Sequence, residues 1–422
     1  MNGHRRRGTA NPWILRVVAG ICVIVAIICI IGLLTDRGST PGKGNPTQIV
    51  SATSGTPTGM TGPTADPTGA APTGSVPTAT PSPTPTPDLS YDFRICFCGD
   101  INFQDGGIPM TKLASVGNDL TKCISPELLE KMNAADITVI NNEFTYTTRG
   151  TPLSGKAWTF RANPSSVSLL HEMGVDVAIL ANNHAYDYGE VSLTDTMETL
   201  QNAGIAYVGA GYNLEEAKRP VYKTVQGKTI AFVAASRAEK NIKTPMATET
   251  KPGILRCYKK GEASNIDEEA IFIEAIREAR QNADFVIAIV HWGADYQEKL
   301  EQVQIDTAKV YLDAGADAII GGHSHKPDPI DFYDGKPIVY GYSNFWFNDK
   351  DLGSMLLELR IHGDDNSGER HVDLYYTPAR QKNVVTTISL GADREKEVAN
   401  MLKISGNRIQ IADDGLVTPV GN

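Results

Sequence analysis

The expected fold is decided by the stretch ADAIIGGHSH at residues 316–325. A short apolar run, of the kind that forms a buried strand, ends there in two glycines and a His-x-His pair. Two histidines at positions i and i+2 of an extended segment point the same way, so His323 and His325 can share one metal or serve two neighbouring ones.

The same pattern, an apolar run that ends in possible metal ligands, occurs four more times. The endings are Gly99-Asp100-Ile101-Asn102 after 95–98, Asn141-Asn142-Glu143 after 137–140, Asn182-Asn183-His184 after 175–180, and His291-Trp292-Gly293 after 285–290. In open α/β sheets, ligands bind outside the carboxyl ends of the strands, so all five endings can converge. Hard cations take carboxylate and amide oxygens, whereas zinc, manganese and iron take imidazole. The pattern predicts a divalent metal centre (Mn, Fe or Zn) with two ions.

Each ending also has a purely structural interpretation. Asp100 is a possible cap of a loop or helix, and Glu143 a solvated turn carboxylate. Asn182 and Asn183 suit turns because asparagine tolerates left-handed backbone. A single histidine beside tryptophan, such as His291, is more often a packed core residue than a ligand. The joint occurrence of the endings at successive strand ends favours the metal centre.

Helix signals separate the strands. Ser125-Pro126 and Asn163-Pro164 each combine an N-cap residue with proline at the first helical position, and amphipathic or glycine-terminated helices are expected over 191–203 and 266–282. Strands that alternate with helices predict βαβ units in a largely parallel sheet. The α/β domain is expected over 89–380, followed by a C-terminal appendage over 381–422, where the signals become sparse.

The N-terminus predicts a membrane anchor. Residues 17–37 contain an apolar run long enough to cross a bilayer, and four arginines lie in the basic segment 1–16. The positive-inside bias predicts a cytoplasmic N-terminus, a single pass through the cell membrane and an extracytoplasmic main domain. A cleaved signal peptide is the alternative, but no Ala-x-Ala-like site follows the run.

Residues 38–88 hold eleven of the 24 prolines, mixed with Thr, Gly and Ser, which predicts a disordered stalk. Residues 89–422 carry 33 basic and 46 acidic residues, a balance that argues against a nucleic-acid partner. The chain has six cysteines. Of these, only Cys123 and Cys257 form a plausible pair, and buried free thiols are the preferred interpretation.

Taken in order, Gly-Asp, Asn-x-Glu, Asn-Asn-His with Asp187-Tyr188-Gly189, His-Trp-Gly, Gly-His-x-His and Ser343-Asn344-Phe345 resemble the CapA capsule-synthesis family. That family is tied to poly-γ-glutamate production and is related to the calcineurin-like metallophosphoesterases. The resemblance covers about 93–347. It implies an α/β sandwich of two central β-sheets flanked by helices, with metals at the strand ends.

Transferred residue by residue, the phosphoesterase pattern makes Glu143 the carboxylate that bridges two metals. One metal takes Asp100 and His325, and the other takes Asn183, His291 and His323. His184 is the general acid that protonates the leaving oxygen. The chain departs from the pattern in having Asn102 where a histidine is usual and Glu143 where an aspartate is usual. A mononuclear or weakly occupied centre is therefore an alternative.

Further residues near the motifs are candidates for orienting the ligands or contacting the substrate: Asn102, Asn141, Asn182, Lys156, Arg161, Asp187, Asp295, Asp328 and Asn344. Lys156 and Arg161 suggest a positive rim for an anionic substrate, although a solvated loop explains them equally well. Two functions remain open. One is a metal-dependent hydrolase that acts on a cell-surface phosphoester, or on an amide of poly-γ-glutamate. The other is a non-catalytic anchor that binds anionic polymer and partners a membrane synthase or export complex.

Overall fold

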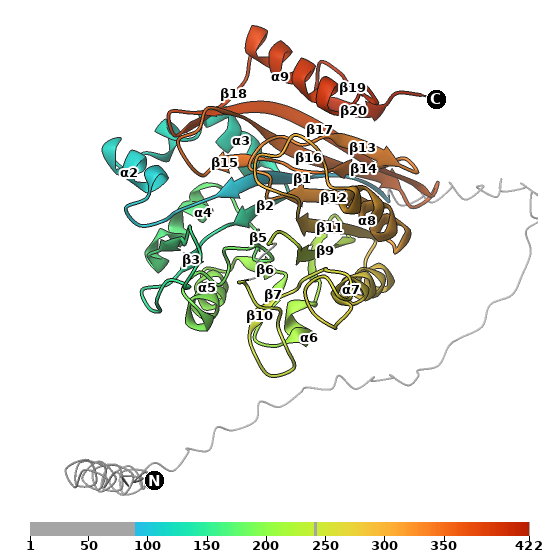
Figure 1. Ribbon diagram of the computed structural model, residues 1–422. Coiled ribbons are helices and arrows are strands. Elements are labelled where there is room, and N and C mark those ends of the chain that lie inside the picture. Colours follow the sequence, from blue (N-terminus) through green and yellow to red (C-terminus); the bar gives the residue numbers. More distant parts are fainter. Residues whose placement is uncertain (1–88, 240–242, 422) are drawn as a thin grey trace, which may run out of the picture. The chain divides into compact units, whose positions relative to one another are not determined.

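The computed structural model describes residues 89–239 and 243–421. Two β-sheets pack face to face, with helices on their outer faces, as Figure 1 shows. The predicted sandwich of two central sheets flanked by helices is confirmed.

The larger sheet has ten strands, and its main order is β19-β20-β17-β16-β1-β2-β5-β6, with β15 beside β1 and β18 beside β17. These strands are β1 (Ser90–Ile101), β2 (Ile137–Asn142), β5 (Val177–Ile179), β6 (Ala206–Val208), β15 (Asn344–Trp346), β16 (Leu352–Asp364), β17 (Glu369–Lys382), β18 (Val385–Ile388), β19 (Ile409–Ile411) and β20 (Leu416–Pro419).

The smaller sheet has six strands in the order β13-β14-β12-β11-β9-β8. They are β8 (Val221–Val225), β9 (Lys228–Ser236), β11 (Phe285–His291), β12 (Ala318–Gly322), β13 (Ile330–Tyr333) and β14 (Lys336–Val339). Two short pairs lie outside both sheets: β3 (Thr145–Tyr146) with β4 (Arg161–Ala162), and β7 (Ala210–Gly211) with β10 (Gly253–Ile254).

The helices are α2 (Ile108–Ser115), α3 (Pro126–Ala134), α4 (Ser168–Glu172), α5 (Glu190–Asn202), α6 (Leu214–Ala217), α7 (Glu268–Asn282), α8 (Gln302–Asp313) and α9 (Gly391–Ile404), with short 3-10 turns at Leu120–Lys122 and Pro164–Val167. The predicted starts at Ser125-Pro126 and Asn163-Pro164 are confirmed, and the Asn163 side chain accepts a hydrogen bond from the Ser165 N–H.

Strand alternation places the core between and around the two sheets. Ile95 and Phe97 of β1 face the smaller sheet, whereas Cys96 and Cys98 face the helices on the outer side. In the smaller sheet, Phe232 of β9 packs into the layer between the sheets, while its neighbours in sequence pack under α7 and α8. Because side chains of a strand alternate between faces, the continuously buried parts of β1 and β9 are covered on both sides, as is typical of parallel strands.

Within each sheet, the strands that carry the sequence motifs are parallel to one another: β1, β2 and β5 in the larger sheet, and β11 and β12 in the smaller one. Their carboxyl ends therefore meet at one edge of the sandwich. The prediction of a largely parallel sheet holds only for this part. The long antiparallel pair β16 and β17 continues the larger sheet on the other side of β1, and β18 and β20 pair antiparallel with β17.

The last forty residues take part in this larger sheet. The boundary expected at 380/381 falls inside β17, and α9 packs against β17 and β19 (Figure 1). All four described cysteines are buried and free, so the preference for free thiols is confirmed. Over 89–239 and 243–421, no helix has both the length and the apolar character needed to cross a membrane. The expected anchor (17–37) and stalk (38–88) lie outside the described residues.

Candidate metal centre

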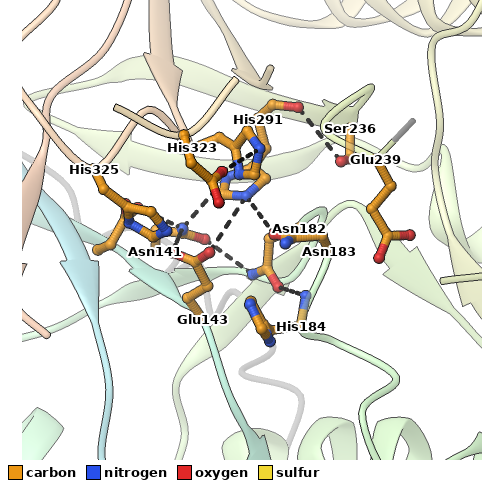
Figure 2. Close-up of polar contacts among 12 residues, drawn as sticks. Asn141, Glu143, Asn182, Asn183, His184, Ser236, Glu239, His291, His323 and His325 are labelled. Atoms are coloured by element: carbon orange, nitrogen blue, oxygen red, sulfur yellow. Dashed lines mark hydrogen bonds and ion pairs between the residues drawn. The ribbon is translucent and has the colours of Figure 1, made fainter. Parts of the chain in front are cut away.

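Two groups of possible metal ligands meet at the carboxyl edge of the sandwich and share one residue. The first consists of Asp100, Glu143 and His325, and the second of Glu143, His291 and His323. Within each group the candidate ligand atoms lie within 4.8 Å of one another, and all five residues are buried. Figure 2 shows the three imidazoles turned toward the Glu143 carboxylate. This is the arrangement expected for two metals bridged by Glu143.

Asp100 is held where β1 pairs closely with the start of β15. The Asp100 N–H donates a 2.9 Å hydrogen bond to the Ser343 carbonyl oxygen, just before β15. A Cβ on Gly99 would lie 1.8 Å from that same oxygen, so only glycine permits the approach. This strand pairing brings Asn344 to the site, where its Oδ1 lies 2.8 Å from His325 Nδ1. The Asp100 Oδ2 lies 3.1 Å from the same nitrogen.

Glu143 is completely buried at the centre of the cluster. Burial raises the pKa of its carboxyl well above the ordinary value of 4.5, and the neighbouring Asp100 raises it further. The Glu143 Oε1 accepts no hydrogen bond from any described residue. A buried carboxylate oxygen without a donor is costly, and a bound cation would remove that cost.

His291 joins β11 to the turn that follows β5. Its Nε2 lies 2.8 Å from Asn183 Oδ1 and 3.6 Å from Glu143 Oε1. Asn183 therefore places an amide oxygen beside the second group. Burial lowers the pKa of His291 well below its ordinary value, and nearby His325 lowers it further. A neutral imidazole is the form that binds metal.

His323 and His325 lie on strained backbone just after β12. Both have positive φ angles, 92° and 58°. Such conformations are uncommon outside glycine and cluster at functional sites. His323 Nε2 lies 3.0 Å from Asp295 Oδ1, and burial lowers the pKa of His323 well below its ordinary value. Burial also acts to lower the pKa of His325, but the hydrogen bond and charge of Asp100 outweigh it and raise that pKa.

His184 lies beside the cluster but belongs to neither ligand group. Its ring is held in place by Asp187. The His184 Nδ1 is 2.7 Å from Asp187 Oδ2, and the imidazole stacks against Phe160 with ring centroids 4.4 Å apart. The Asp187 carboxylate accepts at Nδ1, so Nε2 is the free ring nitrogen. Burial lowers the pKa of His184, while Asp187 acts in the opposite direction.

Lys156 is engaged in this network and is not an open positive rim. Its side chain is only 9% exposed and pairs with Asp187 at 2.7 Å and Glu239 at 3.5 Å. It also donates to the Asn183 carbonyl oxygen, which accepts a second bond from Thr244 Oγ1 at 2.7 Å. Glu239 was not singled out in the sequence, because it follows none of the five strand endings.

Two asparagines orient the ligands through their side-chain amides. Asn141 Nδ2 donates to Asp100 Oδ1 at 2.7 Å and approaches Glu143 Oε2 at 3.3 Å. Asn182 Nδ2 donates to Asn141 Oδ1 at 2.9 Å, and Asn182 Oδ1 accepts from the His184 N–H at 3.0 Å. The chain of amides runs from β1 to the turn after β5 and fixes the carboxylates relative to His184 (Figure 2).

Three candidates have other partners. Asn102 Oδ1 accepts a 2.9 Å hydrogen bond from the Gln104 N–H, which closes a turn. The Arg161 guanidinium lies over the Tyr188 ring at 4.5 Å, and Asp328 pairs with Lys326 at 2.8 Å. The sequence analysis missed Phe347 and Tyr296, whose rings lie 4.8 and 5.5 Å from His325. Phe347 lies just beyond Ser-Asn-Phe and Tyr296 follows Asp295, so proximity to the motifs was the available signal.

The donor set fits a divalent metal pair. It combines two buried carboxylates, three imidazoles and an amide oxygen, which suits manganese, iron or zinc more than calcium or magnesium. Asp100 and Glu143 would hold a cation with His325, and Glu143 would share a second with His291, His323 and Asn183. The unpartnered Glu143 Oε1 and the low pKa values of His291 and His323 support this fit.

Comparisons with known proteins point to the same family that the sequence motifs resemble. The sequence profile of the family described as "Bacterial capsule synthesis protein PGA_cap" matches residues 94–349. The "PGA biosynthesis protein CapA" of Bacillus subtilis is 31% identical over 265 residues, 61% of this chain and 65% of that protein. The "Capsule biosynthesis protein CapA" of Bacillus anthracis is 34% identical over 211 residues, 48% of each chain.

This chain therefore spans between about half and two thirds of the length of these two relatives. Among solved structures, a hypothetical protein from Thermus thermophilus matches with a TM-score of 0.39 and 18% identity, covering 68% of this chain and 99% of that one. The family has the metallophosphoesterase fold, in agreement with the two-sheet sandwich and the predicted fold class. The profile match covers more than half of the sequence, so the chain belongs to the bacterial capsule synthesis protein family PGA_cap.

Proposed function

We propose that this protein acts in the synthesis or export of an anionic capsule polymer, poly-γ-glutamate, and that its metal centre hydrolyses a phosphoester. The observation that carries the hydrolase is the pair of ligand groups that share buried Glu143, with His184 held by Asp187 beside them. The names of the two Bacillus relatives support the capsule role.

A bound pair of divalent metals supplies a water nucleophile at neutral pH and stabilises developing negative charge on the substrate. The chain's own residues would do the rest. Asp187 fixes the ring of His184 through Nδ1, so that in the protonated imidazolium Nε2 would carry the proton that passes to the leaving oxygen. Asn141 and Asn182 hold Asp100, Glu143 and the His184 turn in register. Phe160 covers one face of the imidazole and limits water there.

A second function, polymer binding without catalysis, is favoured by Asn102. The phosphoesterase pattern has a histidine ligand at that position, but here the Asn102 side chain closes a turn. One metal position therefore has one ligand fewer. In this alternative the centre binds carboxylates of the polymer, and the protein assists a membrane synthase.

For the location, we propose a single-pass anchor over 17–37, a stalk over 38–88 and an extracytoplasmic main domain. The basic residues before the apolar run support this orientation.

The deciding experiment measures metal content and turnover of phosphoesters by the full-length protein and its His184→Ala variant. Hydrolysis predicts that the variant keeps its metal and loses roughly 10²–10⁴-fold in turnover, the usual contribution of an acid–base group. The loss should shrink for esters with acidic leaving groups, which depart without a proton. If the variant keeps its metal and cells still make normal amounts of polymer, the binding function is the correct one.

A further inference from the structure

A short path of side chains leads outward from the metal centre to an exposed lysine. The Tyr296 ring lies against His325, with centroids 5.5 Å apart, and the Lys350 ammonium lies 3.7 Å from the centroid of the Tyr296 ring. The lysine is exposed and the tyrosine is half-buried. A positive charge is thus held one aromatic ring away from a candidate metal ligand.

Several hydrogen bonds fix this arrangement before any ligand binds. The Tyr296 N–H donates to the Ser324 carbonyl oxygen at 2.9 Å, between the two histidines of the His-x-His pair. The Tyr296 hydroxyl accepts from Asn348 Nδ2 at 3.3 Å, and Asn348 Oδ1 accepts from the Lys350 N–H at 3.1 Å. Gln381 Nε2 donates to the same Asn348 oxygen at 2.9 Å. Pre-organised groups lose little conformational entropy on binding.

Lys350 also differs from Lys156 and Lys326, the two lysines beside the motifs, in that its ammonium has no carboxylate partner among the described residues. Lys156 is neutralised by Asp187 and Glu239, and Lys326 by Asp328. No carboxylate oxygen of the described residues lies within 4.0 Å of the Lys350 ammonium. Its positive charge is stabilised by the Tyr296 ring, and its hydrogen-bond donors are free of carboxylate partners.

We propose that Lys350, supported by Tyr296, is an anion-binding subsite for the repeat unit next to the group held at the metal centre. The ligand is a carboxylate or phosphate oxyanion of a polyanionic chain. The proposal rests on the proposed function for the choice of polymer, and it gives that function a substrate class: chains that carry a negative charge on the unit flanking the reacting group.

The test measures equilibrium binding of two probes, a short γ-linked oligoglutamate and inorganic polyphosphate, to the full-length protein at low and high salt. We expect Lys350→Met to weaken binding of at least one probe roughly three- to tenfold, the scale of one exposed charge-assisted contact. Lys350→Arg should restore most of the affinity. The difference between wild type and Lys350→Met should shrink at high salt, because exposed charges are screened.

Lys382→Met is the matched control. Lys382 is an exposed lysine whose ammonium already pairs with Asp351 at 3.3 Å, so its removal changes the net charge equally. Equal losses in Lys350→Met and Lys382→Met, or no loss in Lys350→Met, overturn the subsite. The probe that shows the loss identifies carboxylate or phosphate as the ligand.

The outcome is separable from that of the proposed hydrolysis. If no phosphoester is turned over but Lys350→Met still weakens binding selectively, the subsite stands and catalysis fails. If esters are hydrolysed and Lys350→Met binds both probes like the wild type, the subsite alone fails.

Discussion

Asn102 and His323 differ in what their side chains do, although each belongs to a motif. His323 offers an imidazole to the centre, whereas Asn102 accepts a hydrogen bond from the Gln104 N–H. We expect His323→Ala to lower the metal content strongly and Asn102→Ala to leave it nearly unchanged. Asn102→Ala should instead lower the free energy of unfolding by about 1 kcal/mol, through loss of one hydrogen bond. Elemental analysis with thermal unfolding measures both effects, and equal metal losses would contradict this assignment.

Lys156 should matter for stability because it neutralises two carboxylates in a nearly buried place. Lys156→Met leaves Asp187 and Glu239 without their cation, and breaking a buried pair from one side costs about 3–5 kcal/mol. We expect chemical denaturation to show a loss at the lower end of this range. The double variant with Glu239→Gln should recover part of it.

The control for this comparison is Lys326→Met, which should lose less stability because Lys326 pairs with a single carboxylate and its side chain is 21% exposed, against 9% for Lys156. If the two lysine variants lose the same stability, Lys156 has no special structural part in the His184 network.

Glu143 gives a pH prediction for the protein stripped of metal. Its folded-state pKa is raised above 4.5, so between 4.5 and that higher value the folded state holds a proton that the unfolded state has lost. Stability from this group therefore falls as pH rises above 4.5. In chelator, Glu143→Gln should be more stable than the wild type at neutral pH, and the difference should vanish below about pH 4.5. Denaturation curves over this pH range check the prediction, and a difference that grows toward acid pH would refute it.

At the scale of elements, the parallel pairing of β1 with β15 places Asp100 and Asn344 in the site. Gly99→Ala would put a Cβ against the Ser343 carbonyl oxygen, so the strands must separate and Asp100 and Asn344 must shift. Overpacking of this kind costs roughly 1–3 kcal/mol or more. We expect Gly99→Ala to lose both stability and metal. Gly117→Ala is the control, because its Cβ meets no atom within 4 Å and only the positive φ of 76° opposes it.

The strands that end in the motifs could be predicted from the sequence because each is a short apolar run bounded by polar residues. The expected runs 137–140 and 285–290 correspond to β2 and β11 almost residue for residue. The antiparallel half of the larger sheet was not foreseen. In β16 the buried run is followed by partly buried residues, and from sequence alone such a run is compatible with an edge strand as well as with a central strand.

The candidate ligands could likewise be predicted, because carboxylates, amides and imidazoles at parallel strand ends must converge. What could not be predicted was which neighbours neutralise one another. Lys156 meets Glu239 from a distant part of the sequence, and Tyr296 meets Lys350 from a separate loop. The paths of these loops are specified by no local sequence pattern.

For the whole molecule, we expect protease added to intact cells to cut within 38–88 and release a compact fragment. Strand β1 begins at Ser90, and residues 38–88 before it are rich in proline, threonine and glycine. Immunoblotting of the medium detects the fragment. Recovery of protected full-length protein alone would argue against an extracytoplasmic main domain.

The candidate metal ligands come from both sheets: Asp100 and Glu143 lie at the ends of strands of the larger sheet, and His291 and His323 at the ends of strands of the smaller one. A bound ion would therefore link the two sheets, in addition to the apolar layer between them and to polar contacts such as the ion pair of Arg370 with Asp317. Ligand binding to the native state adds about 2.7 kcal/mol of stability when the free ion is at a hundred times its dissociation constant. The stability of the folded protein would then depend on the concentration of free divalent ions around it. A shortage of metal would shorten the lifetime of the folded state as well as leave the site inactive.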